Sequence, residues 1–154
     1  MPSFTTERRV KHSASEMFNL VADVERYPRF VPMCDRLMVR SRERDGDKEI
    51  VIATMTVSYR FLHESFTSRV TLDRKAMTIR AQYLDGPFRH LDNIWSFEEL
   101  GPNDSKVKFT IDYEFRSRTL SALMGVVFDR AFRKFAEAFE TRADEVYGAP
   151  TAPA

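Results

Sequence analysis

The hydrophobic positions at the start of the chain indicate a short strand followed by a helix. Residues Phe4 to His12 are β-forming types with weak alternation, which favours a strand. Ser13 and Glu16 have the spacing of a capping box, in which the serine caps a helix and the glutamate reaches back to its backbone. Apolar residues recur at helical steps as far as Val24, and Pro28 ends this helix or starts a second short turn.

From Leu37 onward the hydrophobic residues follow a period of two, which is typical of strands. Turn signals such as Asp45-Gly46, Asp85-Gly86-Pro87 and Gly101-Pro102 divide this region. Short turns between consecutive strands predict an antiparallel meander with one solvent-exposed face. The predicted strands cover residues 37–41, 49–59, 63–72, 77–84, 90–100 and 107–115.

The last element is a predicted amphipathic helix from Thr119 to Tyr147, whose apolar residues, Leu123 among them, recur at three- and four-residue steps. Gly148 and Pro150 are the expected stop signal, and residues 149–154 are predicted to be a disordered tail. At about 1.5 Å per residue the helix is long enough to cross a sheet. We therefore expect an α+β domain over residues 1–148, in which a curved antiparallel sheet wraps around this helix and leaves a cavity where their side chains do not meet.

Composition agrees with one globular domain. The chain has 154 residues, of which 43% are hydrophobic and 31% charged. Cys34 is the only cysteine, so no internal disulfide forms, which fits a reducing compartment. We expect this thiol to be buried and unreactive.

The charge balance excludes some classes of partner. A net charge of +1, from 24 basic and 23 acidic residues, argues against a DNA-binding protein. The most basic stretch, Arg36 to Lys48, is interrupted by acidic residues and is interpreted as a solvated hairpin. No apolar run approaches the roughly 20 residues of a membrane span, and the N-terminal residues lack a signal-peptide core. We expect a cytoplasmic protein.

Candidate catalytic groups are sparse. The three histidines stand apart from one another in the sequence, and no His, Cys, Asp or Glu residues have zinc-ligand spacing. His63 and Glu64 are neighbours on a predicted strand, so their side chains point to opposite faces and make a poor acid–base pair.

Polar residues on apolar strand faces are better clues. Asn93 shares a face with Leu91 and Trp95, while Glu64 and Ser68 share one with Phe66. Two interpretations stay open: cross-strand hydrogen bonds within the core, or orientation of a polar ligand head in an apolar pocket.

Aromatic residues are abundant, with 13 phenylalanines, and most of them are expected in the core. The segments 25–34 and 85–91, however, place apolar side chains in turn-rich connections. They predict the mouth of a pocket for a large apolar molecule or a patch that touches a membrane, and the two interpretations are compatible.

Five segments of the chain, residues 13–34, 64–72, 85–97, 107–115 and 138–148, match the pattern of a known family. Through them the chain resembles the coenzyme Q-binding branch of the START-like superfamily, whose bacterial members are often labelled polyketide cyclase/dehydrase and include the ribosome-association toxin RatA. Met33 departs from the pattern, because the family favours tryptophan before the cysteine.

The resemblance implies a helix-grip fold whose cavity holds a ubiquinone-like lipid for respiratory electron transport, without a cofactor, a metal or a catalytic residue. Contact with the inner face of the membrane is an accompanying expectation. Inhibition of ribosomal subunit association, with the ribosome as partner, is an alternative function. An aromatase/cyclase is another, with Asn93, Glu64, Tyr59 and His63 as its candidate residues.

The predicted ligand-binding residues fall into three groups. Tyr27, Phe30, Pro32 and Met33 form one lip of the cavity, with Phe88 and Leu91 opposite. The sheet contributes Asn93, Trp95, Phe109, Ile111 and Tyr113, and the last helix contributes Met124, Val127, Phe128 and Phe132.

Overall fold

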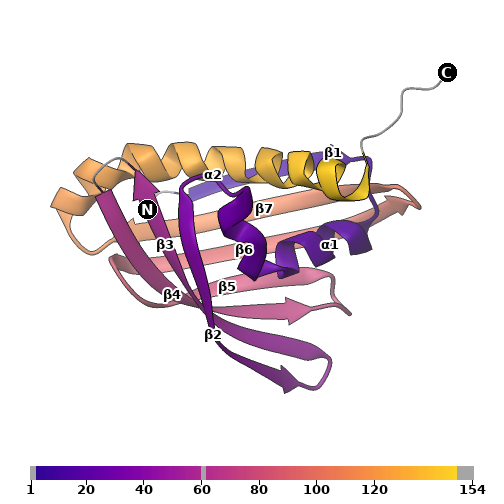
Figure 1. Ribbon diagram of the computed structural model, residues 1–154, viewed down its shortest axis with the longest axis horizontal. Helices are drawn as coiled ribbons and strands as arrows, with labels where there is room; N and C mark the ends of the chain where they lie inside the picture. The colour runs from indigo at the N-terminus through magenta and orange to yellow at the C-terminus, as the bar shows by residue number, and fades with distance from the viewer. Residues whose placement is uncertain (1–2, 60–61, 149–154) are drawn as a thin grey trace.

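The computed structural model describes residues 3–59 and 62–148, and it contains one sheet, one long helix and a pair of short helices (Figure 1). The predicted tail 149–154 lies outside the described residues. The elements in chain order are β1 (Ser3–Val10), α1 (Ala14–Ala22), the 3₁₀ helix η1 (Val24–Arg29), β2 (Cys34–Asp45), β3 (Lys48–Tyr59), β4 (Leu62–Asp73), β5 (Thr78–Asp85), β6 (Phe88–Gly101), β7 (Asp104–Phe115) and α2 (Arg118–Tyr147).

The sheet is a seven-stranded antiparallel meander in the order β1-β7-β6-β5-β4-β3-β2, so the first strand pairs with the last. Helix α2 lies across one face of the twisted sheet, with α1 beside it (Figure 1). The predicted α+β helix-grip fold is confirmed.

The short helices form where the sequence predicts them. The Ser13 hydroxyl accepts from the Glu16 amide and the Glu16 carboxylate accepts from the Ser13 amide, both at 3.1 Å, so the predicted capping box is confirmed. Pro28 lies inside η1, which is the second short turn that was one of its two predicted roles.

Backbone pairing extends several strands beyond their predicted ends, so that β2 continues to Asp45 and β7 already begins at Asp104. β2 begins at Cys34 rather than Leu37, since Cys34 pairs with Val57 across a bulge. β6 begins at Phe88, which pairs with Phe115 of β7, so most of the predicted turn-rich connection 85–91 belongs to a strand.

The core lies between the sheet and the helices, and α2 packs most closely against β7, β1 and α1. On β7 alternate residues from Ser105 to Phe115 are buried. Leu123, predicted on the apolar stripe of α2, is instead 56% exposed, because the buried side of the helix at this level is formed by Met124 and Phe128. Between α2 and strands β3–β5 the backbones are further apart. Side chains from both fill only part of this space, and the cavity lies there.

Candidate ligand-binding cavity

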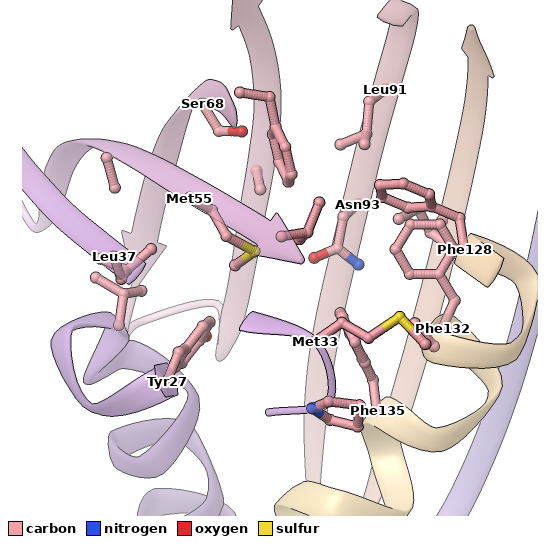
Figure 2. Close-up of a pocket in the computed structure, with 18 of the residues that line it drawn as sticks. Tyr27, Met33, Leu37, Met55, Ser68, Leu91, Asn93, Phe128, Phe132 and Phe135 are labelled. Carbon is pink, nitrogen blue, oxygen red and sulfur yellow. The ribbon is translucent and has the colours of Figure 1, made fainter. Parts of the chain in front are cut away.

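A cavity of about 100 Å³ lies between the sheet and α2 (Figure 2). Inward-facing residues of β2–β7 form one wall, α2 forms the other, and residues of η1 and the segment that follows it close one side. Its described lining contains no Asp, Glu, Lys, Arg, His or Cys. A space of this kind suits an apolar ligand and offers no charged group to a polar one.

The segment from Phe30 to Met33 forms a lip over the cavity. Met33 has a left-handed backbone, with φ of 64°, which is uncommon for a residue with a side chain. The Met33 carbonyl accepts a hydrogen bond of 2.9 Å from the Ser58 amide, which ties the lip to the end of β3. This geometry directs the Met33 side chain across the cavity toward Phe132 of α2 (Figure 2).

Aromatic packing supports the lip from behind. The Tyr27 hydroxyl donates to the Val21 carbonyl at 2.5 Å, and burial raises the pKa of Tyr27 above its ordinary value. The Tyr27 and Phe30 rings both meet the edge of Phe139, with centroids 5.3 and 5.0 Å away, and the Arg142 guanidinium lies over Phe30. The base of the lip is thus held by α2.

Two polar side chains stand out on the wall. Asn93 Nδ2 donates to the Thr110 carbonyl at 2.9 Å, which fixes the amide orientation and leaves Oδ1 and the second N–H for a ligand (Figure 2). Ser68 is buried, and among the described residues its hydroxyl has no hydrogen-bond partner. Of the two interpretations of these residues, Asn93 fits both at once: it bonds across strands and faces the cavity.

Three methionines add flexible side chains to the remaining wall. Met33, Met55 and Met124 contribute thioethers that adopt several rotamers at low cost, so they repack around different shapes. Phe132 and Phe135 add rings from α2. The present volume suits a ring-sized group, and a longer molecule requires these side chains to move or a path past the lip.

Cys34 lies at the base of the lip and is buried, as predicted. Burial raises the pKa of its thiol to about 12, and Sγ donates weakly to the Arg36 carbonyl at 3.8 Å. The thiol therefore stays protonated at neutral pH and is a poor nucleophile.

The four candidate acid–base residues do not converge. Asn93 and Tyr59 line the cavity, whereas Glu64 and His63 are outside its lining. His63 is exposed, with Nδ1 2.8 Å from the Ser58 hydroxyl. Over residues 3–59 and 62–148 no group of three His, Cys, Asp or Glu side chains has the geometry to hold a metal ion.

The structure brings most of the predicted ligand-binding residues to one cavity. Those on its wall are Tyr27, Pro32, Met33, Leu91, Asn93, Trp95, Ile111, Met124, Val127, Phe128 and Phe132. Whether they contact a ligand stays a prediction.

Phe30, Phe88, Phe109 and Tyr113 lie off the wall, in contrast to the prediction. The ring of Phe30 packs on Phe139 of α2 instead of entering the cavity lining, and Phe88 is fully buried in an aromatic cluster at the start of β6. Phe109 and Tyr113 lie on β7, directly beneath α2, where their rings meet helix residues rather than open space. Burial alone did not distinguish these positions from the wall.

Sequence reasoning missed the contribution of the far strands. The alternation on β3, β4 and β5 identified their inward faces but not that these faces border the cavity. The lining residues absent from the predicted ligand-binding set are Val24, Leu37, Ala53, Met55, Val57, Ser58, Tyr59, Phe66, Ser68, Val70, Ile79, Ala81, Ala131, Phe135 and Phe139. Of these, Ser68 was expected only as a possible ligand-head group and Tyr59 only as an aromatase/cyclase candidate.

Within the described residues no helix is both long and apolar enough to cross a bilayer.

Comparison with known proteins gives relatives along almost the whole chain. The ribosome association toxin RatA of Escherichia coli strain K12 is 32% identical over 149 residues, covering 97% of this chain and 91% of the toxin. The mitochondrial coenzyme Q-binding protein COQ10 homolog B of Xenopus laevis is 31% identical, covering 92% of this chain and 57% of that protein.

Solved structures share the fold. The solution structure of an 18 kDa protein from Caulobacter crescentus is 34% identical, with a TM-score of 0.78 over 97% of this chain and 100% of that one. The aromatase/cyclase Zhui of a Streptomyces species has the same TM-score, 0.78, over 94% of both chains at 18% identity, which shows the fold alone.

The family described as polyketide cyclase / dehydrase and lipid transport matches residues 10–140. The chain belongs to this family.

Proposed function

We propose that this member of the polyketide cyclase/dehydrase and lipid transport family binds ubiquinone or a similar polyisoprenoid lipid without chemical turnover. The observation that carries the proposal is an apolar cavity whose described wall has no charged side chain and only a few polar ones. A coenzyme Q-binding relative, similar over 92% of this chain, supports the choice of lipid. The role would be to hold or deliver quinone for respiratory electron transport, from the cytoplasmic side of a membrane.

Burial of the isoprenoid tail supplies most of the affinity. Each buried CH₂-sized group contributes about 0.8 kcal/mol, so even two isoprene units outweigh a single hydrogen bond. The cavity of about 100 Å³ accommodates the head ring, and the methionine side chains of the wall, or the lip, have to move to make room for the tail.

The polar wall groups suit a quinone head in both redox states. The oxidised ring presents carbonyl oxygens, for which the Ser68 hydroxyl and the free N–H of Asn93 are donors. The reduced ring presents hydroxyl groups, for which Asn93 Oδ1 is an acceptor. Because the two side chains come from β4 and β6, they approach the head from different strands.

Binding without turnover follows from the chemistry of the wall. General acid–base catalysis needs a titratable group within hydrogen-bond reach of the substrate. The titratable side chains on the described wall are the phenols of Tyr27 and Tyr59, and Tyr27 donates to a backbone carbonyl. We therefore favour a binding protein over an aromatase/cyclase.

The test is mass spectrometry of a solvent extract from natively purified protein, with a redox difference spectrum of the same extract. We expect a near-stoichiometric quinone in the wild-type protein. Ala81→Phe places a ring in the cavity and is expected to remove it, whereas Ala76→Phe, the same change at an exposed turn residue, retains it. Circular dichroism and thermal unfolding check that both variants fold.

Retention of quinone by folded Ala81→Phe would place the lipid elsewhere on the protein. An extract without any lipid from the wild-type protein would contradict the proposal. Asn93→Leu tests the head contact separately: loss of about one hydrogen bond is expected to weaken quinone retention roughly tenfold.

A second candidate is contact with the ribosome, favoured by the 32% identity to RatA over 97% of the chain. Binding to ribosomal RNA is expected to weaken steeply with salt. Sedimentation with ribosomal subunits over a salt series tests it, and Ala81→Phe separates the two candidates because a cavity filler leaves the outer surface unchanged.

A further inference from the structure

The outer face of the first half of α2 exposes two large aliphatic side chains. Val126 is 64% exposed and Leu123 is 56% exposed, more than any other large hydrophobic residue in the described part of the chain. Because they are three residues apart in a helix, they lie on the same side. Exposing two adjacent aliphatic side chains to water does not stabilise the folded monomer. This side of α2 is therefore a candidate binding surface.

This face is continuous with the cavity wall. Met124 and Val127, neighbours of the exposed pair along α2, line the cavity, and Val127 is itself only half-buried. Leu123 and Val127 are one helical turn apart, so their side chains lie side by side. The same turns of α2 thus present apolar surface inward and outward.

Unpaired arginines flank the exposed pair. Arg130 follows Val126 by one turn, and Arg118 stands at the helix start; neither has an ion-pair partner among the described residues. The sequence 118–128 has no acidic residue. A cation in the first turn opposes the helix dipole, so helix stability does not account for Arg118.

A surface hollow of about 470 Å³ beside the start of α2 extends the basic character of this end. Arg89, Arg116 and Arg118 line it together with the single carboxylate of Glu114. Glu114 lies 3.9 Å from Arg89, and Arg116 donates to the Phe88 carbonyl. The exposed aliphatic pair therefore lies between cationic groups at both ends.

We propose that this face docks on an anionic lipid bilayer, with the arginines against lipid phosphates and with Leu123 and Val126 inserted at the headgroup boundary. A bilayer supplies both negative charge and an apolar layer at the same surface. The phosphates of a nucleic acid would also bind the arginines, but a nucleic acid offers no apolar layer in which Leu123 and Val126 could be buried. The inference rests on the proposed function only in that a lipid would cross between cavity and bilayer beside this face.

The test is co-sedimentation of the full chain with vesicles of phosphatidylcholine, with and without about one third phosphatidylglycerol. We expect binding to the anionic vesicles, lowered roughly tenfold by Val126→Ser and further by Leu123→Ser, since each loses its apolar insertion. Val146→Ser is the matched control, the same change near the other end of α2, where Val146 is 49% exposed. It is expected to bind like the wild type.

The charge contribution is tested with Arg130→Gln, which is expected to weaken vesicle binding roughly fivefold, an effect that salt reduces. Arg44→Gln is its control, because Arg44 is exposed near the tip of the β2–β3 hairpin.

Three outcomes would overturn the inference: no binding to anionic vesicles, equal losses for Val126→Ser and Val146→Ser, or a loss for Arg130→Gln alone together with binding to ribosomal subunits. The last would make this an RNA-binding face. Because vesicle binding does not require a loaded cavity, its failure is distinguishable from an empty lipid extract.

Discussion

The two halves of α2 are attached to the protein in different ways. In the second half, Glu140 accepts from Arg8 of β1 at 2.9 and 2.5 Å, and Asp144 lies 2.7 Å from the buried His12 ring. Phe139 is buried among Trp95 and the lip aromatics. In the first half, the contacts to the sheet are made by side chains such as Phe128, and no ion pair joins that half to the sheet within the described residues.

The two halves therefore have different roles: the second half fixes the helix on the sheet, and the first half can adapt to a ligand. Directional bonds in the second half fix its position on the sheet, since an ion pair and a buried histidine contact tolerate little displacement. The first half relies on apolar contacts without ion pairs to the sheet, and the flexible thioether of Met124 rearranges at low cost around a ligand. Most of the α2 residues on the cavity wall belong to the first half, whereas the lip is held by Phe139 of the second half.

The largest contrast is expected from truncating one apolar residue in each half. Phe139→Ala removes a buried ring and should lower the free energy of unfolding by about 3–5 kcal/mol. Leu123→Ala removes an exposed side chain and should change it by less than about 0.5 kcal/mol. Urea denaturation measures both, and similar losses would show that the halves are equally anchored.

A smaller contrast is expected from the carboxylates of the two halves. Asp144→Ala leaves the buried His12 ring without its partner and should cost about 1–3 kcal/mol in unfolding free energy. Asp129→Ala breaks only the exposed pair with Arg133, worth at most about 0.5 kcal/mol. An Asp144→Ala variant with unchanged unfolding free energy would show that the contact with His12 does not help to attach the second half of α2.

Alkaline pH is expected to lower the unfolding free energy through Tyr27 and Cys34, the two buried groups next to the lip. Burial raises the pKa values of Tyr27 and Cys34 in the folded protein, so above about pH 9 the unfolded chain loses these protons first. Unfolding free energy is then expected to fall with rising pH, by at most about 1.4 kcal/mol per pH unit for each group.

Denaturation at a series of pH values between neutral and strongly alkaline measures this slope. Tyr27→Phe combined with Cys34→Ala should flatten it, although Tyr113 and Tyr147, whose pKa values burial also raises, leave a residual slope. An unchanged slope in the double variant would assign the effect to other groups.

The smallest expected effect comes from replacing a glycine in the first half of α2. Gly125 lies inside α2, and an added Cβ would meet only Ser121 Oγ at 4.0 Å. Gly125→Ala should therefore raise unfolding free energy by about 0.5–1 kcal/mol. Gly46→Ala, at a hairpin residue with φ of +63°, should lower it instead, and a loss of stability in Gly125→Ala would indicate a packing role for the glycine.

Local patterns predicted most of the fold. The capping box at Ser13, the alternation along β7 and the three- and four-residue steps of α2 each follow from the geometry of one element. The start of β6 at Phe88 did not, because a strand begins where a partner strand offers backbone groups, here at Phe115. Pairing over long sequence separation is absent from any local pattern.

The sequence by itself determined which residues are buried on the sheet and which elements they belong to; the tertiary structure decided which buried residues border empty space. Phe109 and Ile111 are two residues apart on β7 and almost equally buried, yet only Ile111 lines the cavity. Leu123 belongs to the apolar period of α2 but is exposed. Periodicity reports which way a side chain points, whereas a cavity depends on the distance between two elements, and the sheet's curvature sets that distance.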